Sequence, residues 1–428
     1  MTISLGIDFG TTGARAIAID IEQNVRAEAR VEFKLSSDGI KSWQKALFSL
    51  LEQIALSVRR ETIAIAINGT SSTVLLCDEK GNPLDAPILY NDGRAAGEVE
   101  ALKEIAPPQS VVLSATSSLG KLLWWFRQPV YSLAAYFLHQ ADWLAFLLHG
   151  KLGISDYHNA LKLGYDIENL CYPHWVQQLP VYPLVPRVVS PGNPVGEISP
   201  SISRRFSLPD TCQVCAGTTD SIAAFLASGA TQPGEAVTSL GSTLVLKLLS
   251  RDRVENARYG IYSHRIAIAH LGGTVGEPDL WLTGGASNTG GAVLRHFFSD
   301  EELTRLSQEI DARTESPLDY YPLLNKGDRF PINDPQLPPR LQPRPDNSVE
   351  FLHGLLESIA RIETQGYQLL QQLGATSLTR IYTAGGGAKN DSWTEIRQRR
   401  LRVPIAPAAN TAAAYGTALL AMRLGVRL

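Results

Sequence analysis

The sequence has little of what several classes of protein require. Its four cysteines are too few for a disulfide framework in a chain of 428 residues. No uninterrupted apolar run reaches the roughly 18 residues that a membrane span needs, and the N-terminus lacks the basic-then-apolar pattern of a signal peptide. The net charge is −3, and no basic domain favours duplex nucleic acid as a partner. We therefore expect a soluble protein of the cytoplasm, or of the plastid stroma if a transit peptide has been removed, without membrane or nucleic-acid partners.

The chain also lacks the best-known nucleotide-binding motifs. It has no G-x-x-x-x-G-K-[ST] loop and no G-x-G-x-x-G loop, which argues against a P-loop enzyme, a protein kinase and a dinucleotide-binding domain. If a nucleotide binds, backbone turns must hold it. The eight histidines form no ligand cluster. Cys212 and Cys215 form a lone C-x-x-C on a predicted strand, where alternation places them on opposite faces as buried thiols. The arginines from Arg397 to Arg402 are interpreted as a solvated helix face.

The composition, with 44% hydrophobic and 19% charged residues, is typical of a globular protein. Its length favours two or three domains. Strand patterns alternate with helical patterns, which predicts an α/β fold with a mixed sheet. The predicted elements include strands over 5–20 and 62–67, a helix over 42–60, helical segments over 98–148, a glycine-rich loop over 282–291, a clean amphipathic helix over 348–373 and a final helix over 412–424.

The stretch from Leu5 to Asp20 reads as a strand, a tight turn and a second strand. Asp8 ends the first strand, and Thr11 and Thr12 stand in the turn between two glycines. Amide groups in such a turn form an anion site, threonine hydroxyls add donors, and an aspartate can hold a hydrated Mg²⁺ on a phosphate. The stretch is therefore either a phosphate-and-metal hairpin or an ordinary glycine-turned hairpin.

A second hairpin of the same kind spans residues 235–249. Gly241, Ser242 and Thr243 stand where Gly10, Thr11 and Thr12 stand in the first. A repeated hairpin predicts two similar domains that act on one ligand.

Three aspartates lie beside small-residue turns at predicted strand ends, where α/β sheets bind ligands. They are Asp8, Asp92 and Asp220. Phosphoryl transfer needs a metal to neutralise the phosphates and a carboxylate to accept the proton of the attacking hydroxyl. Asp8 and Asp220 fit these two roles, although Asp220 taken alone is more simply interpreted as a helix N-cap.

In their order and spacing, the motifs resemble the FGGY carbohydrate kinase family of the sugar kinase/Hsp70/actin superfamily. The resemblance runs over nearly the whole chain. Its elements are Gly6-Ile-Asp-Phe-Gly-Thr-Thr-Gly-Ala-Arg15, Asn68-Gly-Thr-Ser-Ser72, Ile88-Leu-Tyr-Asn-Asp-Gly-Arg94, Ala216-Gly-Thr-Thr-Asp220, Ser239-Leu-Gly-Ser-Thr243, the glycines from Gly284 to Gly291, and Gly385-Gly-Gly-Ala-Lys-Asn390.

The resemblance implies two RNase H-like (actin-like ATPase) domains that flank a catalytic cleft. Residues 1–228 would bind the sugar, residues 229–401 would bind the nucleotide, and the final segment 402–428 would pack back on the first domain. ATP and Mg²⁺ are implied, with Asp8 at the metal, Thr11 at the γ-phosphate and Asp220 as the base. The implied sugar site comprises Asp8, Ser72, Asp92, Arg94 and Asp220, and the implied nucleotide site comprises Thr11, Thr12, Gly241, Ser242, Gly291, Arg295, Gly386, Gly387 and Asn390.

The pair Ser71-Ser72 departs from better-known members of the family. Xylulokinase-like members have a Met-His pair there, and glycerol kinase-like members have Arg-Glu. The chain is also shorter than typical members and looks most like the short ketopentose kinases of cyanobacteria and plants. We therefore expect a monomeric or homodimeric kinase of D-ribulose. The alternatives are a kinase of D-xylulose, glycerol or another ketose or polyol, and an actin- or Hsp70-like ATP-binding switch without a sugar substrate.

Overall fold

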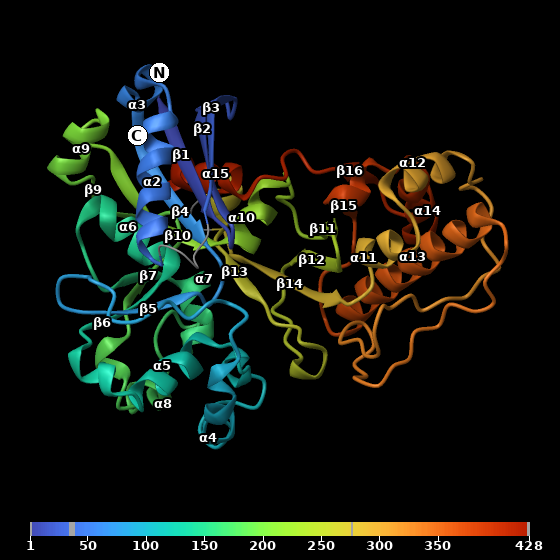
Figure 1. Cartoon of the computed structure of the whole chain (residues 1–428), viewed down its shortest axis with the longest axis horizontal. Coiled ribbons are helices and arrows are strands. Elements are labelled where there is room, and N and C mark those ends of the chain that lie inside the picture. The colour runs from blue at the N-terminus through green and yellow to red at the C-terminus, as the bar shows by residue number, and fades with distance from the viewer. Residues whose placement is uncertain (1, 34–38, 275–276, 426–428) are drawn as a thin grey trace. The chain divides into compact units, whose positions relative to one another are not determined.

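The computed structural model describes residues 2–33, 39–274 and 277–425. The chain divides into two compact units (Figure 1). The first comprises Met1–Ala227, Ala267–Glu277 and Ala412–Leu428, and the second comprises Ser228–Ile266 and Pro278–Thr411. These bounds differ from the expected ones at three places, because 267–277 belongs to the first unit, and Ser228 and 402–411 belong to the second. The last three residues of the expected final segment, 426–428, lie outside the described residues.

The first unit is built on a mixed six-stranded sheet. The strand order is β3-β2-β1-β4-β10-β9. β1, β4 and β10 are parallel to one another, whereas β2 pairs antiparallel with β1 and β9 antiparallel with β10. The strands are β1 (Ile3–Phe9), β2 (Gly13–Asp20), β3 (Val25–Glu32), β4 (Thr62–Gly69), β9 (Pro194–Glu197) and β10 (Gln213–Thr219).

Helices pack on this sheet from elements far apart in sequence. α2 (Lys41–Gln53) and α6 (Gln140–His149) bury their apolar side chains, including Trp43 and Leu144, in the core that also holds Ile7. α15 (Ala413–Gly425) packs on β1 and β4 and against α10 (Asp220–Ala227). Its backbone comes so close to β1 that a Cβ on Gly6 would lie 2.1 Å from the carbonyl oxygen of Ala414. This position therefore requires glycine.

Two of the predicted helical segments are interrupted. The helix predicted over 42–60 breaks after α2 because Ile54 has extended backbone, and α3 (Leu56–Arg60) follows. The stretch 98–148 contains a strand, β6, which pairs with β5. The remaining elements of this unit include β5 (Val74–Cys77), α4 (Val99–Lys103), α5 (Ser118–Phe126), β6 (Tyr136–His139), β7 (Ile154–Asp156), α7 (Tyr157–Ala160), α8 (His174–Gln177), β8 (Arg187–Val189) and α9 (Pro200–Phe206).

The second unit repeats the strand arrangement of the first. Its sheet has the order β13-β14-β12-β11-β15-β16. The hairpin β11–β12 corresponds to β1–β2, β14 to β3, and the parallel strands β15 and β16 to β4 and β10. The strands are β11 (Glu235–Leu240), β12 (Leu244–Ser250), β13 (His264–Ile266), β14 (Leu280–Ser287), β15 (Arg380–Ala384) and β16 (Ile405–Pro407), and the helices are α11 (Gly291–Phe297), α12 (Asp300–Gln308), α13 (Ser348–Gln372) and α14 (Asp391–Leu401).

One helix of this unit is confirmed and one loop was wrongly predicted. α13 matches the amphipathic helix predicted over 348–373. The predicted glycine-rich loop over 282–291 is mostly strand β14. Its glycines allow close packing within the sheet, since a Cβ on Gly284 would lie 1.9 Å from the carbonyl oxygen of Leu246. Glycine in a strand can mark a close backbone approach as well as a turn.

The cysteine prediction is confirmed, and the arginine prediction is wrong. Cys212 and Cys215 are fully buried in separate apolar clusters, and burial raises the pKa of each thiol to about 12. Arg397 is fully buried rather than solvated. Its guanidinium forms two hydrogen bonds with Glu363, at 2.7 and 2.8 Å, and a third with Thr383 at 2.8 Å. The buried carboxylate of Glu363 therefore compensates for the burial of the Arg397 charge.

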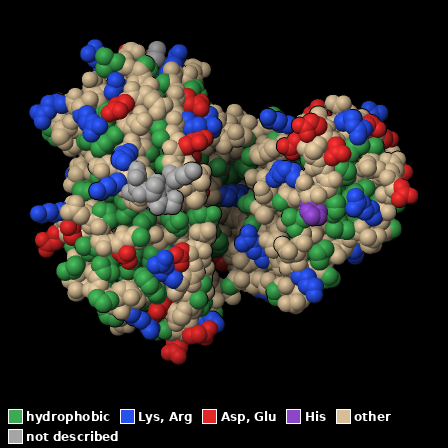
Figure 2. All heavy atoms as spheres, viewed as in Figure 1, with side chains coloured by type: hydrophobic (Ala, Val, Ile, Leu, Met, Phe, Trp, Pro, Cys, Tyr) green, Lys and Arg blue, Asp and Glu red, His purple; other side chains and the backbone are tan. Residues whose placement is uncertain are grey.

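The surface is mixed in charge. Basic and acidic side chains are interspersed on the visible face of each unit in Figure 2. Among the residues that the structure describes, no helix is both long and apolar enough to cross a lipid bilayer.

Candidate active site

The first unit brings two of the predicted aspartates to one edge of its sheet. Asp8 stands near the carboxyl end of β1, opposite Asn68 of β4. Asn68 is in turn opposite Thr218 of β10, and Asp220 begins α10 directly after that strand. Parallel strands end at the same edge, which is where α/β sheets bind ligands. The pairing of β1, β4 and β10 therefore places Asp8 and Asp220 together.

The electrostatics of Asp8 reflect this neighbour. Burial and, to a smaller extent, the negative charge of Asp220 raise the pKa of Asp8 to about 6, against the opposing effects of a hydrogen bond from Asn68 and the charge of Arg15. An ionised Asp8 is thus held in the fold at a cost. Two neighbouring carboxylates in such a place are typical of a cation site or of acid–base chemistry.

We expect Asp8→Asn to stabilise the protein free of nucleotide and metal. Because the pKa of Asp8 in the folded state is above the ordinary value of 3.8, protonation of Asp8 favours the folded state at low pH. This stabilisation is lost as the pH rises through 6. At pH 8 the free energy of unfolding of the variant should therefore be about 1–3 kcal/mol higher than that of the natural protein. This difference should shrink as the pH falls from 6 to 4. Urea denaturation in EDTA at several pH values measures it.

The matched control is Asp78→Asn. Hydrogen bonds from Asn82 and Lys80 hold the pKa of Asp78 below its usual range, the opposite of Asp8. This control should give no gain in stability at pH 8. Equal stability of Asp8→Asn and the natural protein at pH 8 would contradict the electrostatic account.

The strand ends also contain polar residues of the quoted motifs to which the sequence assigned no role. Asn68 is fully buried, and its amide nitrogen donates a 2.6 Å hydrogen bond to Thr417 of α15. The side-chain oxygens of Asn68 and Thr219 have no hydrogen-bond partner. Buried polar atoms are nearly always paired, so these two are typical of a site that water or a ligand completes. Their signal in the sequence was a small polar residue ending each parallel strand.

The turn of the first hairpin presents its threonines to solvent. The amide of Gly10 donates a 2.9 Å hydrogen bond to the carbonyl of Gly13, and Thr11 and Thr12 are exposed. A Cβ on Gly13 would lie 3.0 Å from the carbonyl oxygen of Val31, so this glycine serves close packing on β3. The accessible hydroxyls are suited to contact a phosphate.

The three remaining sugar-site candidates lie in two turns of the first unit. Asp92 accepts hydrogen bonds from the Arg94 guanidinium at 2.7 and 3.0 Å, which holds the pKa of Asp92 below its usual range. Arg94 also lies over the ring of Trp124, 4.8 Å from its centroid. Ser72 is only 1% exposed, has left-handed backbone with φ of 63°, and has no partner for its hydroxyl.

In the second unit, most of the nucleotide candidates gather around the turn of the β11–β12 hairpin. The carbonyls of Gly241 and Ser242 accept hydrogen bonds from the first amides of α11, at 2.9 and 3.0 Å. A Cβ on Gly291 would lie 2.6 Å from the Gly241 oxygen, and one on Gly387 would lie 2.7 Å from Leu240. Arg295 donates a 3.2 Å hydrogen bond to the Ser242 hydroxyl. A larger residue would collide with the backbone at Gly291 and with the Leu240 side chain at Gly387.

The last two nucleotide candidates differ in what surrounds them. A Cβ on Gly386 would meet nothing within 4 Å, so its backbone is open to a ligand. Asn390 caps α14, accepting a hydrogen bond from the amide of Trp393 at 2.9 Å, and donates to Ser307 at 2.8 Å. Its side chain therefore has a structural task in this unit.

The first unit also fits a magnesium ion that is carried by a phosphate. Among the described residues no three His, Cys, Asp or Glu side chains form a metal-binding group. Mg²⁺ does not require one, because it commonly binds one or two carboxylates and takes its other ligands from water and substrate phosphates. Asp8 provides one such carboxylate, and a cation would relieve the cost of ionising Asp8.

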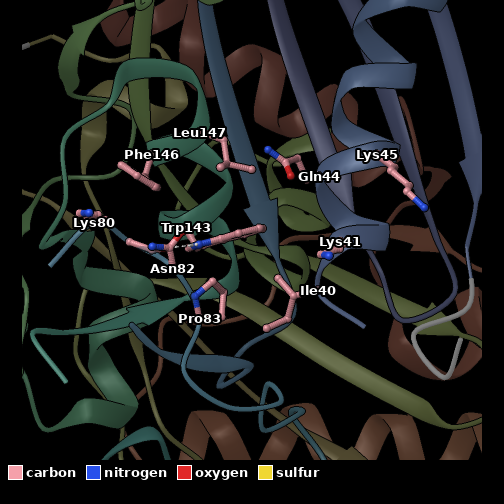
Figure 3. A pocket seen from close by; sticks show the side chains of 11 residues that line it. Ile40, Lys41, Gln44, Lys45, Lys80, Asn82, Pro83, Trp143, Phe146 and Leu147 are labelled. Atoms are coloured by element: carbon pink, nitrogen blue, oxygen red, sulfur yellow. Dashed lines mark hydrogen bonds between the residues drawn. The ribbon is translucent and has the colours of Figure 1, made fainter. Parts of the chain in front are cut away.

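A separate hollow of about 810 Å³ lies on the same unit (Figure 3). It lies between α2, α6 and the turn at Gly81, where the Trp143 indole donates a 3.0 Å hydrogen bond to the Gly81 carbonyl. Phe146, Leu147 and several lysines also line it. None of the predicted site residues line this hollow, so it is distinct from the candidate active site.

Comparison with known proteins identifies the class. The model of the N-terminal domain of the FGGY family of carbohydrate kinases matches residues 3–227, and the model of the C-terminal domain matches residues 236–424. The chain belongs to this family. It is an ATP-dependent carbohydrate kinase that uses Mg²⁺. This assignment excludes the alternative of an actin- or Hsp70-like ATP-binding switch without a sugar substrate.

Several relatives match over almost the whole chain. A xylulose kinase of Bacillus subtilis is 23% identical over 98% of this chain and 88% of its own length. A glycerol kinase of Trichlorobacter lovleyi is 24% identical over 98% of this chain and 90% of its own. The crystal structure of a xylulose kinase from Rhodospirillum rubrum, 22% identical, superposes with a TM-score of 0.81, covering 99% of this chain and 90% of that one. The structural likeness shows the same two-domain fold.

Proposed function

We propose that this kinase transfers the γ-phosphoryl group of ATP to a hydroxyl of a ketopentose, with D-ribulose as the first candidate substrate. The observation that carries the proposal is the pair Asp8 and Asp220 at the carboxyl ends of parallel strands, with the pKa of Asp8 raised by burial and by Asp220. A sugar kinase needs one carboxylate at the phosphates and another at the hydroxyl, and this pair supplies both.

In this mechanism the base is Asp220. It accepts the proton of the sugar hydroxyl as that oxygen attacks the γ-phosphorus, and the bond from this phosphorus to the β–γ bridging oxygen breaks as ADP leaves. Asp8 would hold a Mg²⁺ ion, which when bound would neutralise charge on the phosphates, and Thr11 would lie at the γ-phosphate. Ser72, Asp92 and Arg94 belong to the sugar end, and Asp92 and Arg94 shape it by pairing with each other.

The residues around the turn of the second hairpin bind the nucleotide. Gly241, Ser242 and Gly291 bring backbone groups of two elements together, and Gly386 leaves its backbone open. Arg295, Gly387 and Asn390 complete the proposed set of the second unit, and Thr12 is a separate proposed nucleotide contact of the first unit.

The choice of D-ribulose depends on Ser71 and Ser72. Two small hydroxyl-bearing residues make a sugar pocket unlike the Met-His or Arg-Glu pairs of the better-known enzymes. D-Xylulose is the second candidate, because xylulose kinases recur among the relatives that match more than nine tenths of the chain. The two sugars differ at a single carbon, so a small change in the pocket decides between them.

The test is an assay of ADP release with a panel of D-ribulose, D-xylulose, L-ribulose, glycerol and gluconate. We expect turnover well above basal ATPase with a ketopentose, and the highest kcat/KM with D-ribulose. A higher kcat/KM for D-xylulose would replace D-ribulose with the second candidate. Turnover that no ketopentose raises above the basal rate would overturn the proposal.

A further inference from the structure

The sugar-end residues of the first unit are joined by a buried lysine outside every motif. Lys121 lies in the first turn of α5 and is fully buried. Its ammonium donates a 2.7 Å hydrogen bond to the carbonyl of Ser72 and another of 2.7 Å to the carbonyl of Leu89. These carbonyls belong to the two turns that contain the sugar-site candidates.

We propose that Lys121 is a positioning residue for the sugar, which fixes the Ser72 turn and the Asp92–Arg94 turn at a set spacing. The inference rests on the proposed function, because it names how one end of that site is built. Lys121 is not proposed to touch the reacting atoms.

The Ser72 turn needs support because its backbone is strained. Ser72 has a φ of 63°, in the left-handed region that favours glycine. Gln140 accepts a hydrogen bond from the amide of Thr70 at 3.0 Å, and Thr73 accepts one from Tyr90 at 3.0 Å. Lys121 adds the bond to the carbonyl of Ser72 itself. A strained turn persists when its surroundings hold it from several sides.

The second turn is held at the same point. The Leu89 carbonyl accepts a hydrogen bond from the Asp92 amide at 3.0 Å and the bond from Lys121. One ammonium therefore connects the backbone beside Ser72 with the backbone that begins the Asp92–Arg94 turn. We call this pair of hydrogen bonds from Lys121 the clamp. It fixes the distance between the two turns, whereas a hydrogen bond within one turn does not.

Burial of the Lys121 side chain disfavours its charged form. Burial lowers the pKa of Lys121 to about 7, while the charge of Asp92 opposes that shift. A buried charge contributes little to stability compared with a well-packed apolar side chain, so its presence favours a role in fixing a conformation.

The test compares Lys121→Met and Lys121→Gln with the natural protein, using the best sugar from the panel. Lys121→Met removes the clamp at similar volume, and we expect the KM for sugar to rise about 10- to 100-fold, because small displacements of binding groups have effects of this size. The KM for ATP should change less than twofold. Lys121→Gln keeps two N–H donors and should recover part of the sugar KM. Lys103→Met, at an exposed lysine of the same unit, is the matched control and should change neither constant.

The outcomes separate the two proposals. If the natural protein has no sugar-dependent turnover, the proposed function fails. If it has such turnover and folded Lys121→Met keeps the natural sugar KM, only the role of Lys121 fails. Equal losses for sugar and ATP, or a failure of both variants to fold, would make Lys121 a general core residue and would also overturn the inference.

Discussion

Replacing Asp220 with asparagine is expected to lower kcat for sugar phosphorylation by about 10²- to 10⁴-fold, the usual contribution of a general base. The change keeps the shape of the side chain and removes its ability to accept a proton. The first turn of α10 should survive, because an amide oxygen can still accept the hydrogen bond that the Ser221 amide donates to Asp220 at 2.7 Å. The measurement is single-turnover phosphorylation of the best sugar.

ATP binding should remain largely intact in Asp220→Asn, because most proposed nucleotide residues belong to the second unit. Titration with ATP and Mg²⁺ by calorimetry measures this directly. Asp220→Ala should lose transfer to a similar extent, and Glu79→Gln, at an exposed carboxylate of the same unit, should have natural activity. Near-natural turnover of either Asp220 variant would remove Asp220 from the role of base and leave it as a helix-starting residue.

Replacing Arg397 with methionine is expected to lower the free energy of unfolding of the second unit by about 3–5 kcal/mol, the cost of leaving a buried charge without its partner. Arg397 and Glu363 are both fully buried and form two hydrogen bonds. The Thr238 hydroxyl, which donates a 2.6 Å hydrogen bond to Glu363, would be the carboxylate's remaining partner among these contacts. Urea denaturation of the chain measures the loss.

A double variant distinguishes the ion pair from simple packing. Arg397→Met combined with Glu363→Leu removes both charges and should recover most of the lost stability, since apolar residues often replace a buried pair at little cost. Arg305→Met is the matched control, because Arg305 pairs with Glu309 on an exposed helix face and should contribute less than about 1 kcal/mol. If the double variant is no more stable than Arg397→Met, volume rather than charge governs this site.

Local patterns gave correct predictions where a few consecutive residues decide the structure. The α/β class, the two glycine hairpins and the helix α13 followed from hydrophobic periodicity and from small residues at turns. Local patterns failed where the partner is distant in sequence. By local sequence patterns, the glycines that begin at Gly284 predict a loop. In the structure β12 lies so close to β14 that only glycine fits at Gly284.

The candidate site divides in the same way. Asp8, Thr11 and Asp220 were predicted as site residues because each stands in a short motif with its own chemistry. Asn68, Thr219 and Lys121 were given no role, because the surroundings of their side chains depend on residues far along the chain. A lysine inside an apolar helix, as in Leu119-Gly-Lys-Leu-Leu123, was the one local sign of the clamp.

The sequence by itself determined the family and the residue types at the strand ends, because these reside in short motifs whose order can be read along the chain. Only the tertiary structure decided that Asp8 stands beside Asp220, that Arg397 is buried against Glu363 and that Lys121 joins two turns. The physical reason is that the ionisation and burial of a side chain depend on which distant segments the sheets bring next to it.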